Sequence, residues 1–293
     1  MLITQANKAR HVTMIRFLVF CYTIYSPSLP LFPPPPHALH PRLRRAPQKF
    51  LGPGPTSHLL QRSVWEVRGC LLTPPFERSV ALSYPSLLSY LIPGKLTWCT
   101  MELVSPVCFI IALYTHSHSL TQPQLITSLL FITHYVNRSI IYPLFNPSQS
   151  ASHLLVLLSA TAFNTANGSL QGWYAARVEK IDCIGVSVMV LGFSGNVYHD
   201  VLLFNTKRRA KGGYAIPSGG LFDYVSFPNY FCEWIEWLGY ALATKSWLHS
   251  PPFTFLLALI AVMLPRAYNG QRWYRARFND YPASRKIVIP YIL

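Results

Sequence analysis

The stretch LTWCTMELVSPVCFIIAL, residues 96–113, contains a single charged side chain, the carboxyl group of Glu102. A helix that crosses the hydrocarbon core of a bilayer needs about 20 predominantly apolar residues. This stretch therefore predicts a transmembrane helix over residues 96–115. Stretches of similar length and apolar character follow at 123–145, 152–174, 184–204, 228–246 and 252–268.

The composition of the whole chain is typical of a protein that spans a membrane. Hydrophobic residues make up 51% of the 293 positions and charged residues only 12%, whereas about 25% of a soluble domain is charged. Lys and Arg outnumber Asp and Glu by 25 to 10, for a net charge of +15. A nucleic-acid-binding protein or a basic disordered tail would be polar as well as basic. We therefore expect contacts with membrane lipids and no nucleic-acid partner.

The predicted fold is all-α, a polytopic transmembrane helix bundle of about seven spans. The seventh span is either residues 14–32 or residues 79–93. The segment 207–211 and the C-terminal tail are strongly basic, and basic residues collect on the cytoplasmic side of a membrane. The loop 175–183 is balanced in charge and suits the lumenal side. We therefore expect a multi-pass protein with a cytoplasmic C-terminus, whose N-terminal apolar stretch is an anchor rather than a removed leader.

Two domains are predicted, a divergent N-terminal region over residues 1–93 and a membrane catalytic domain over residues 94–293. The segment 27–75 holds twelve of the 25 prolines, which are too many for a helix, so we expect it to be irregular. A polyproline ligand for an SH3 or WW domain and an intron read into the gene model are the alternatives.

Short motifs indicate neither a metal nor a glycan. The six cysteines form no C-x-x-C pair, so we predict no zinc site and no disulfide framework. No G-x-G-x-x-G lies between a strand and a helix, which leaves a soluble dinucleotide-binding fold unsupported. The sequons at 137–139 and 167–169 fall inside predicted spans, and we expect neither to be glycosylated.

Polar side chains inside the apolar stretches are the candidate functional groups, because an ionisable residue in a span is a functional hypothesis by default. Exclusion of water favours the neutral form of the Glu102 carboxyl, and a neutral carboxyl can donate a hydrogen bond to a carbonyl oxygen. A structural acid bonded to a neighbouring helix is the alternative. His134, Arg138 and Tyr142 recur every four residues and share one helix face, with Tyr135 beside them, so this stripe must face the protein interior.

Two later stretches carry similar polar stripes. Asn196 and Asp200 are four residues apart, and Asn229, Glu233 and Glu236 follow at spacings of four and three. Such spacing places each set on one helix face. A hydrogen-bond network between packed helices would explain the first pair, and a wall that faces a cofactor is the functional interpretation of both sets.

The last third of the chain also carries many specific identities at fixed spacing. They include Ile216-Pro217, Gly219-Gly220-Leu221-Phe222, Glu236-Trp237, Gly239-Tyr240-Ala241-Leu242-Ala243-Thr244, Asp280-Tyr281-Pro282 and Ser284-Arg285-Lys286. Earlier spans contribute Trp98-x-x-x-Glu102 and His134-Tyr135-x-x-Arg138. From about residue 94 onward, this pattern resembles the steroid 5α-reductase family, the membrane-bound 3-oxo-5α-steroid 4-dehydrogenases.

The resemblance implies an NADPH-dependent oxidoreductase of the endoplasmic reticulum membrane that reduces a C=C bond conjugated to a ketone in a steroid or another lipid. It places Glu102 and Tyr135 at the substrate carbonyl as catalytic residues, and Phe163 and Trp237 in the substrate pocket. Cytoplasmic loops and the basic tail would cover the cofactor. The implied cofactor-binding residues are Arg138, Asn146, Asn196, Asp200, Lys207, Tyr214, Asn229, Glu233, Arg266 and Tyr274.

The chain departs from the vertebrate members mainly on the substrate side. Ala258 and Val262 stand where those enzymes carry phenylalanines, and Ser159 replaces an arginine near the pocket mouth. Gln149 replaces another arginine near the cofactor. We therefore expect a wider pocket and leave the exact lipid open. The alternatives are an enoyl-CoA or polyprenol reductase of the same superfamily, a membrane methyltransferase, and a channel, scaffold or catalytically inactive product.

Overall fold

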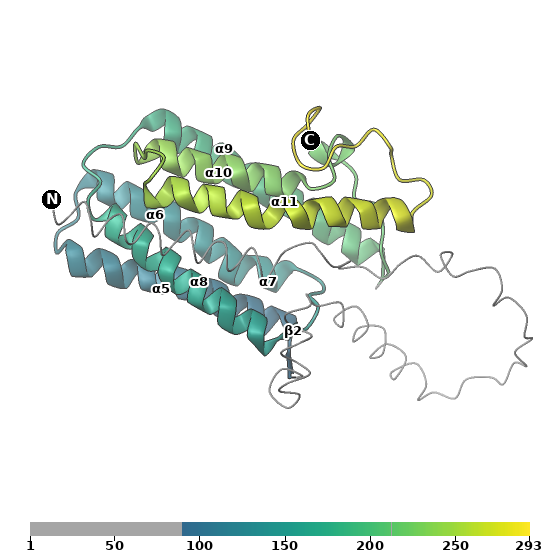
Figure 1. The fold of residues 1–293 in the computed structure, drawn as a ribbon, viewed down its shortest axis with the longest axis horizontal. Coiled ribbons are helices and arrows are strands. Elements are labelled where there is room, and N and C mark those ends of the chain that lie inside the picture. The colour runs from purple at the N-terminus through teal and green to yellow at the C-terminus, as the bar shows by residue number, and fades with distance from the viewer. Residues whose placement is uncertain (1–89, 212) are drawn as a thin grey trace, which may run out of the picture.

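The computed structural model describes residues 90–211 and 213–293, which form a bundle of long helices lying side by side (Figure 1). The all-α class is confirmed, and each of the six apolar stretches corresponds to a helix. The two positions proposed for a seventh span, 14–32 and 79–93, lie outside the described residues except for residues 90–93. The proline-rich segment 27–75 also lies outside them. The long helices are α5 (Gly94–His116), α6 (Gln122–Val136), α8 (Leu154–Ala175), α9 (Cys183–Arg209), α10 (Pro228–Ala243) and α11 (Pro251–Arg277).

The apolar pattern of residues 123–145 predicted one uniform helix, but the structure differs there. After α6 the backbone passes through a π-helix, η3 (Asn137–Ile141), into the short α7 (Tyr142–Phe145). The N–H of Tyr142 donates to the carbonyl of Asn137, five residues earlier. π-Turns within helices occur frequently at functional sites, and this one contains Arg138.

Local side-chain chemistry explains where several helices begin. The Asp182 carboxylate caps α9 by accepting hydrogen bonds from the backbone N–H groups of Ile184 and Gly185, at 2.9 and 3.0 Å. Thr121 and Gln124 form a capping box at the start of α6, which satisfies two otherwise free backbone donors. Both α10 and α11 begin at a proline, whose missing N–H costs nothing in the first helical turn.

Two helix pairs, α5 with α8 and α9 with α10, pack together along most of their length. A Cβ atom on Gly168 would collide with the backbone of Ser105, and one on Gly192 would collide with the backbone of Glu236. Small residues let the backbones of two helices approach closely. In a membrane this close packing holds helices together, because the hydrophobic effect does not drive their association there. These two glycines therefore set the distances across which the polar side chains of the site meet.

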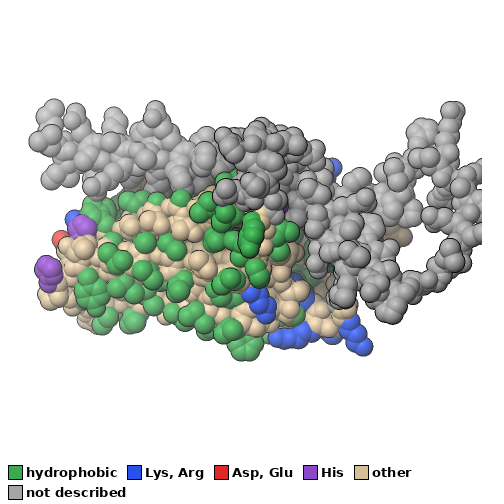
Figure 2. Space-filling view, turned by 90° about the horizontal axis from the view of Figure 1, so that it is seen from below, with side chains coloured by type: hydrophobic (Ala, Val, Ile, Leu, Met, Phe, Trp, Pro, Cys, Tyr) green, Lys and Arg blue, Asp and Glu red, His purple; other side chains and the backbone are tan. Residues whose placement is uncertain are grey.

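Three helices, α5, α9 and α11, are long and apolar enough to cross a membrane, with mean hydropathy of 1.8, 1.3 and 1.4. Of the remaining long helices, α6 and α10 have only 15 and 16 residues. Hydrophobic side chains cover the flank of the bundle, while Lys and Arg gather at one end (Figure 2). On α5 the exposed apolar residues are Leu96, Leu103, Val107, Ile110, Ile111 and Tyr114. These features support a membrane protein, whereas the predicted number of seven spans is not established.

Aromatic rings form the centre of the bundle. Phe109 of α5 stacks on Phe131 of α6, with ring centroids 4.2 Å apart, and Phe131 contacts Tyr135 at 4.7 Å. Trp237 and Tyr240 of α10 are fully buried against the same cluster. Such pairs contribute about 0.5–1.5 kcal/mol beyond the burial of their area, so this cluster fixes the position of Tyr135.

The C-terminal tail is fastened to the loop that precedes α10, at the end of the bundle marked C in Figure 1. The N–H groups of Ser226 and Phe227 donate to the carbonyls of Lys286 and Ile287, at 2.9 and 3.0 Å. Arg285 donates from Nη1 to the carbonyl of Pro217 at 2.9 Å. The loop includes the 3-10 helix η4 (Gly220–Asp223) and two glycines with positive φ, Gly219 at 92° and Gly220 at 55°. At the same end, β1 (Leu91–Ile92) pairs antiparallel with β2 (Ser152–His153).

Candidate functional site

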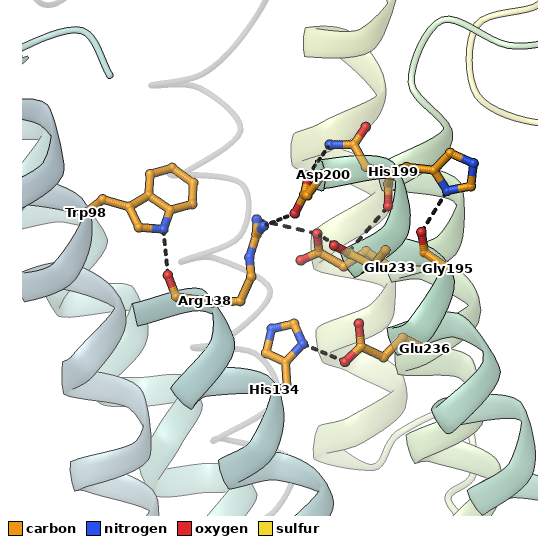
Figure 3. Close-up of polar contacts among 10 residues, drawn as sticks. Trp98, His134, Arg138, Gly195, His199, Asp200, Glu233 and Glu236 are labelled. Atoms are coloured by element: carbon orange, nitrogen blue, oxygen red, sulfur yellow. Dashed lines mark hydrogen bonds and ion pairs between the residues drawn. The ribbon is translucent and has the colours of Figure 1, made fainter. Parts of the chain in front are cut away.

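A buried guanidinium group lies at the centre of the polar interior (Figure 3). Arg138 Nη1 is 3.5 Å from Asp200 Oδ2 on α9, and Nη2 is 3.4 Å from Glu233 Oε2 on α10. The guanidinium also lies over the rings of Tyr142 and Trp98, at 4.9 and 5.3 Å from their centroids. Two carboxylates and two aromatic faces therefore compensate for the removal of this cation from water.

Two asparagines complete this cluster. Asn196 Nδ2 donates to Glu233 Oε2 at 3.1 Å, and Asn229 Nδ2 donates to Asp200 Oδ1 at 3.3 Å. We call Arg138, Asn196, Asp200, Asn229 and Glu233 the Arg138 network. It brings together five of the ten residues predicted to bind a cofactor, from η3, α9 and α10. The carbonyl oxygen Oδ1 of Asn196 is buried and finds no hydrogen-bond partner in the described part of the chain.

A second polar pair lies between the end of α9 and the segment that follows α7. Lys207 Nζ donates to Asn146 Oδ1 at 3.0 Å and to the carbonyl of Ser148 at 3.3 Å. Asn146 is 1% exposed, and within residues 90–211 and 213–293 its Nδ2 group has no acceptor. The pair thus holds a cation and an unused amide donor side by side.

Three predicted cofactor residues lie apart from these groups. Tyr214 is 70% exposed and packs edge-on against Trp273, with centroids 4.8 Å apart. Tyr274 stacks on Tyr281 of the tail at 5.4 Å, and Arg266 is exposed on α11. The contacts described for these residues do not connect them to the Arg138 network, so their role stays a prediction.

The two predicted catalytic residues lie on adjacent helices, Glu102 on α5 and Tyr135 on α6. Tyr135 is 2% exposed, and its hydroxyl oxygen accepts a hydrogen bond from Asn167 Nδ2 at 3.0 Å. Glu102 is close enough to interact electrostatically with Tyr135 and with Arg138. Among the described hydrogen bonds none joins the Glu102 carboxyl directly to the Tyr135 hydroxyl, and their shared role at a substrate carbonyl stays a prediction.

The residues predicted to line the substrate pocket converge on α11. Trp237 is fully buried and contacts Phe255 edge-on, with centroids 4.5 Å apart. The ring centroid of Phe163 on α8 lies 6.2 Å from that of Phe255. Together these rings form an aromatic wall behind Tyr135, whose ring centroid is 6.2 Å from that of Trp237.

The sequence analysis did not predict the hydrogen bond between His134 and Glu236. His134 Nδ1 lies 2.6 Å from Glu236 Oε1, and both side chains are buried. Each residue was visible as part of a polar stripe on its own helix, but they are 102 positions apart. Nothing in the sequence pairs one stripe with another. The bond ties the helix of Tyr135 to the helix of Trp237.

His199 was also not assigned a role from sequence. Its Nδ1 lies 2.6 Å from the carbonyl of Gly195 and its Nε2 accepts from the N–H of Leu221 at 3.0 Å. A backbone carbonyl can only accept, so Nδ1 carries the proton. Figure 3 shows the imidazole beside the Gly195 carbonyl of its own helix. Through its bond to Leu221 it joins α9 to η4 and so to the glycine-rich loop.

The described residues contain no group of three or more His, Cys, Asp or Glu side chains placed to hold a metal ion. The four cysteines in this part of the chain, Cys99, Cys108, Cys183 and Cys232, are free thiols. The site therefore consists of carboxyl, phenol, amide and guanidinium groups.

Fold and site together define a helical protein of membrane type with a buried phenol, a nearby carboxyl group and a charged network between its helices. The family model of 3-oxo-5-alpha-steroid 4-dehydrogenase matches residues 150–293. Mouse 3-oxo-5-alpha-steroid 4-dehydrogenase 2 is 36% identical, covering 69% of this chain and 82% of its own length. Steroid 5-alpha-reductase DET2 of Arabidopsis thaliana is 34% identical over the same shares. An uncharacterized Schizosaccharomyces pombe protein is 35% identical, covering 69% of this chain and 85% of its own.

The chain belongs to the 3-oxo-5-alpha-steroid 4-dehydrogenase family. It is an enzyme, an oxidoreductase that acts on CH–CH groups.

Proposed function

We propose that this protein reduces a C=C bond conjugated to a ketone in a steroid or sterol-like lipid, with NADPH as the reductant. The observation that carries the proposal is the buried Tyr135 hydroxyl, which lies near the Glu102 carboxyl and beside an aromatic wall. Methyl transfer has no use for a phenol placed in this way, and the relatives are named as steroid reductases.

The polar groups of the site fit a dinucleotide. Asn146 Nδ2 is a buried donor and Asn196 Oδ1 a buried acceptor, and both lack a partner among the described residues. Asn196 Oδ1 suits the N–H2 group of a nicotinamide carboxamide, and Asn146 Nδ2 suits an oxygen acceptor elsewhere on the dinucleotide. Lys207 beside Asn146 offers a cation for a phosphate. The Arg138 network would hold the nicotinamide end, with Tyr214, Arg266 and Tyr274 toward the rest of the molecule. When bound, NADPH supplies the hydride that adds to the β-carbon of the enone.

The protein groups act at the other end of the conjugated system. Tyr135 donates its O–H to the ketone oxygen, where negative charge develops as the enolate forms. Glu102, acting as a neutral acid, supports the same oxygen. Donors fixed in a site without water stabilise such charge strongly. A proton from water then adds to the α-carbon, so that one enone, one hydride and one proton give one saturated ketone.

We place the enzyme in the endoplasmic reticulum membrane as a multi-pass protein of about seven spans with a cytoplasmic C-terminus. The apolar flank and three sufficiently long apolar helices support a membrane location. The basic end of the bundle contains Lys207, Arg208 and the tail, and basic residues favour the cytoplasmic side. The loop 214–226 and the tail bound to it would cover the cofactor from that side.

The test is NADPH oxidation by membranes containing the full chain, with a panel of a Δ4-3-keto steroid, an enoyl-CoA and a polyprenol. We expect oxidation with the keto steroid and a saturated ketone in equal amount. Tyr135→Phe, which removes only the hydroxyl, is the matched control and should abolish most of the turnover. Oxidation supported by the thioester or the polyprenol alone would contradict the proposal.

A further inference from the structure

We propose that Asn167 is a positioning residue for Tyr135, donating a hydrogen bond to the phenol oxygen so that the phenol O–H is left for the substrate carbonyl. The inference rests on the proposed function, in which Tyr135 is that donor. In the sequence Asn167 stood out only as the first residue of a sequon. In the structure it is 4% exposed and lies on α8 between α5 and α6.

Both ends of the Asn167 side-chain amide are hydrogen-bonded. Its Nδ2 group lies 3.0 Å from Tyr135 Oη and 3.4 Å from Ser105 Oγ. Its Oδ1 atom accepts from Gln171 Nε2 at 3.3 Å. Because the Gln171 donor faces Oδ1, the N–H2 end of the Asn167 amide faces Tyr135. Ser105 and Gln171 are both fully buried, so no water competes for these bonds.

The direction of this bond has a chemical consequence. A phenol has one O–H donor and acceptor lone pairs on its oxygen. Since Asn167 donates, it occupies a lone pair and does not take up the O–H, and the Ser105 hydroxyl, which also lies within reach of this oxygen, can donate to it in the same way. The same N–H also stabilises negative charge on the phenol oxygen as its proton is shared with the substrate. The direction of donation thus prepares Tyr135 to act as a donor, while Phe131 holds its ring from the side at 4.7 Å.

The fold supports this geometry directly. Gly168, the next residue, lets the backbone of α8 approach that of Ser105. Because the two backbones are this close, the short Asn167 side chain contacts both Ser105 on α5 and the hydroxyl of Tyr135 on α6.

Asn164 is the matched control for a purely structural amide. It lies on the same helix, about one turn earlier, and is 5% exposed. Its Nδ2 donates to the carbonyl of Met101 on α5 at 2.7 Å. It joins the same two helices without contacting Tyr135, so its replacement reports on helix packing alone.

The first experiment measures reduction of a Δ4-3-keto steroid by the full chain in membranes. If the wild-type chain reduces no enone, the proposed function fails, and the outcome does not bear on the direction of the Asn167 bond. With an active wild type, we expect Asn167→Ala and Asn167→Leu each to lower kcat about 10-fold or more, with KM and NADPH affinity within about twofold. Asn164→Ala should leave kcat within about twofold.

Two comparisons separate positioning from packing. In a Tyr135→Phe background, Asn167→Ala should cause no further loss, because the residue acts through the hydroxyl. An additive loss would overturn the proposal. Asn167→Leu keeps roughly the shape of the side chain but removes the donor, so near-normal turnover in this variant would show that Tyr135 does not need the amide N–H, and would overturn the proposal as well.

A binding measurement tests Asn167 without turnover. A steroid with a phenolic A-ring presents an oxygen that resembles that of the enolate. We expect its affinity to fall about 10-fold in Asn167→Ala, about the net worth of one hydrogen bond, because Tyr135 loses its orienting partner, and to stay unchanged in Asn164→Ala. Equal affinity of the wild type and Asn167→Ala would overturn the proposal even where the enzyme is active.

Discussion

At the scale of single residues, replacing Glu102 should affect the chemical step and not cofactor binding. Glu102 lies on α5 near Tyr135, and although its charge interacts with that of Arg138, it makes no described hydrogen bond to the Arg138 network. We expect Glu102→Gln to preserve the fold and the NADPH affinity while lowering turnover about 10²-fold, the effect of losing one support of a developing oxyanion. Steady-state kinetics with a keto steroid would measure this, and near-normal turnover would exclude a catalytic role for the carboxyl.

Asp200 is the complementary case, because its carboxylate binds Arg138 and Asn229 and makes no described contact with Tyr135. Asp200→Ala leaves a buried guanidinium with one carboxylate fewer, a costly change inside a protein. We expect NADPH to bind at least about 10-fold more weakly, with a smaller effect on the chemical step. Titration of NADPH by intrinsic fluorescence would test this expectation.

The control for Asp200 is the other carboxylate of the same helix. Asp182 caps the far end of α9, and Asp182→Ala should cost about 1 kcal/mol of stability without changing NADPH affinity. If Asp200→Ala likewise changes stability alone, the Arg138 network stabilises the packing of the helices and does not bind the cofactor.

At the scale of elements, the contact between α9 and α10 depends on Gly192. A Cβ atom there would meet the backbone of Glu236, which cannot rotate away as a side chain could. We expect Gly192→Ala to destabilise the protein by about 1–3 kcal/mol, the usual cost of overpacking, and to lower its thermal midpoint in detergent. Gly195→Ala is the matched control, since its Cβ would meet chiefly the Cys232 thiol. Equal midpoints for the two variants would contradict this account.

Element positions were predictable because apolar length and periodicity are local properties of the sequence. The expected stretch 184–204 lies within α9, and the expected pair Asn196 and Asp200 does share one face of it. The π-helix at 137–141 could not be foreseen, since an extra residue in one turn leaves the apolar pattern almost unchanged. The π-helix places Arg138 in a widened turn. The backbone carbonyl of Arg138 accepts a hydrogen bond from the Trp98 indole N–H at 2.9 Å.

At the scale of the whole molecule, the pairing of helices determined what the sequence could not reveal. Polar stripes were visible on each helix, but the rotation and axial position of one helix against another are set by tertiary packing. The bonds from His134 to Glu236 and from Asn167 to Tyr135 depend on those two quantities. Sequence periodicity thus indicated which polar residues face the protein interior, whereas their partners on other helices required the assembled bundle.

The substrate pocket is the feature in which this chain should differ most from its vertebrate relatives. Phe255, Ala258 and Val262 recur at spacings of three and four on α11 and share one face, and Phe255 on that face contacts Trp237. Ala258 is 2% exposed, so this small side chain lies inside the bundle, where the vertebrate enzymes are expected to place a phenylalanine. We therefore expect better use of bulky Δ4-3-keto sterols than of compact steroids.

Competition between a C19 and a C27 enone measures this preference directly. Ala258→Phe with Val262→Phe should shift it toward the C19 substrate by about 10-fold or more, because one buried phenylalanine side chain is worth about 1.5–3 kcal/mol. Leu257→Phe is the matched control, because Leu257 is 46% exposed on another face of the same helix and its replacement should leave the preference unchanged. A wild-type preference for the C19 enone would mean that side chains from other helices fill the space beside Ala258, and that the pocket is no wider than in the relatives.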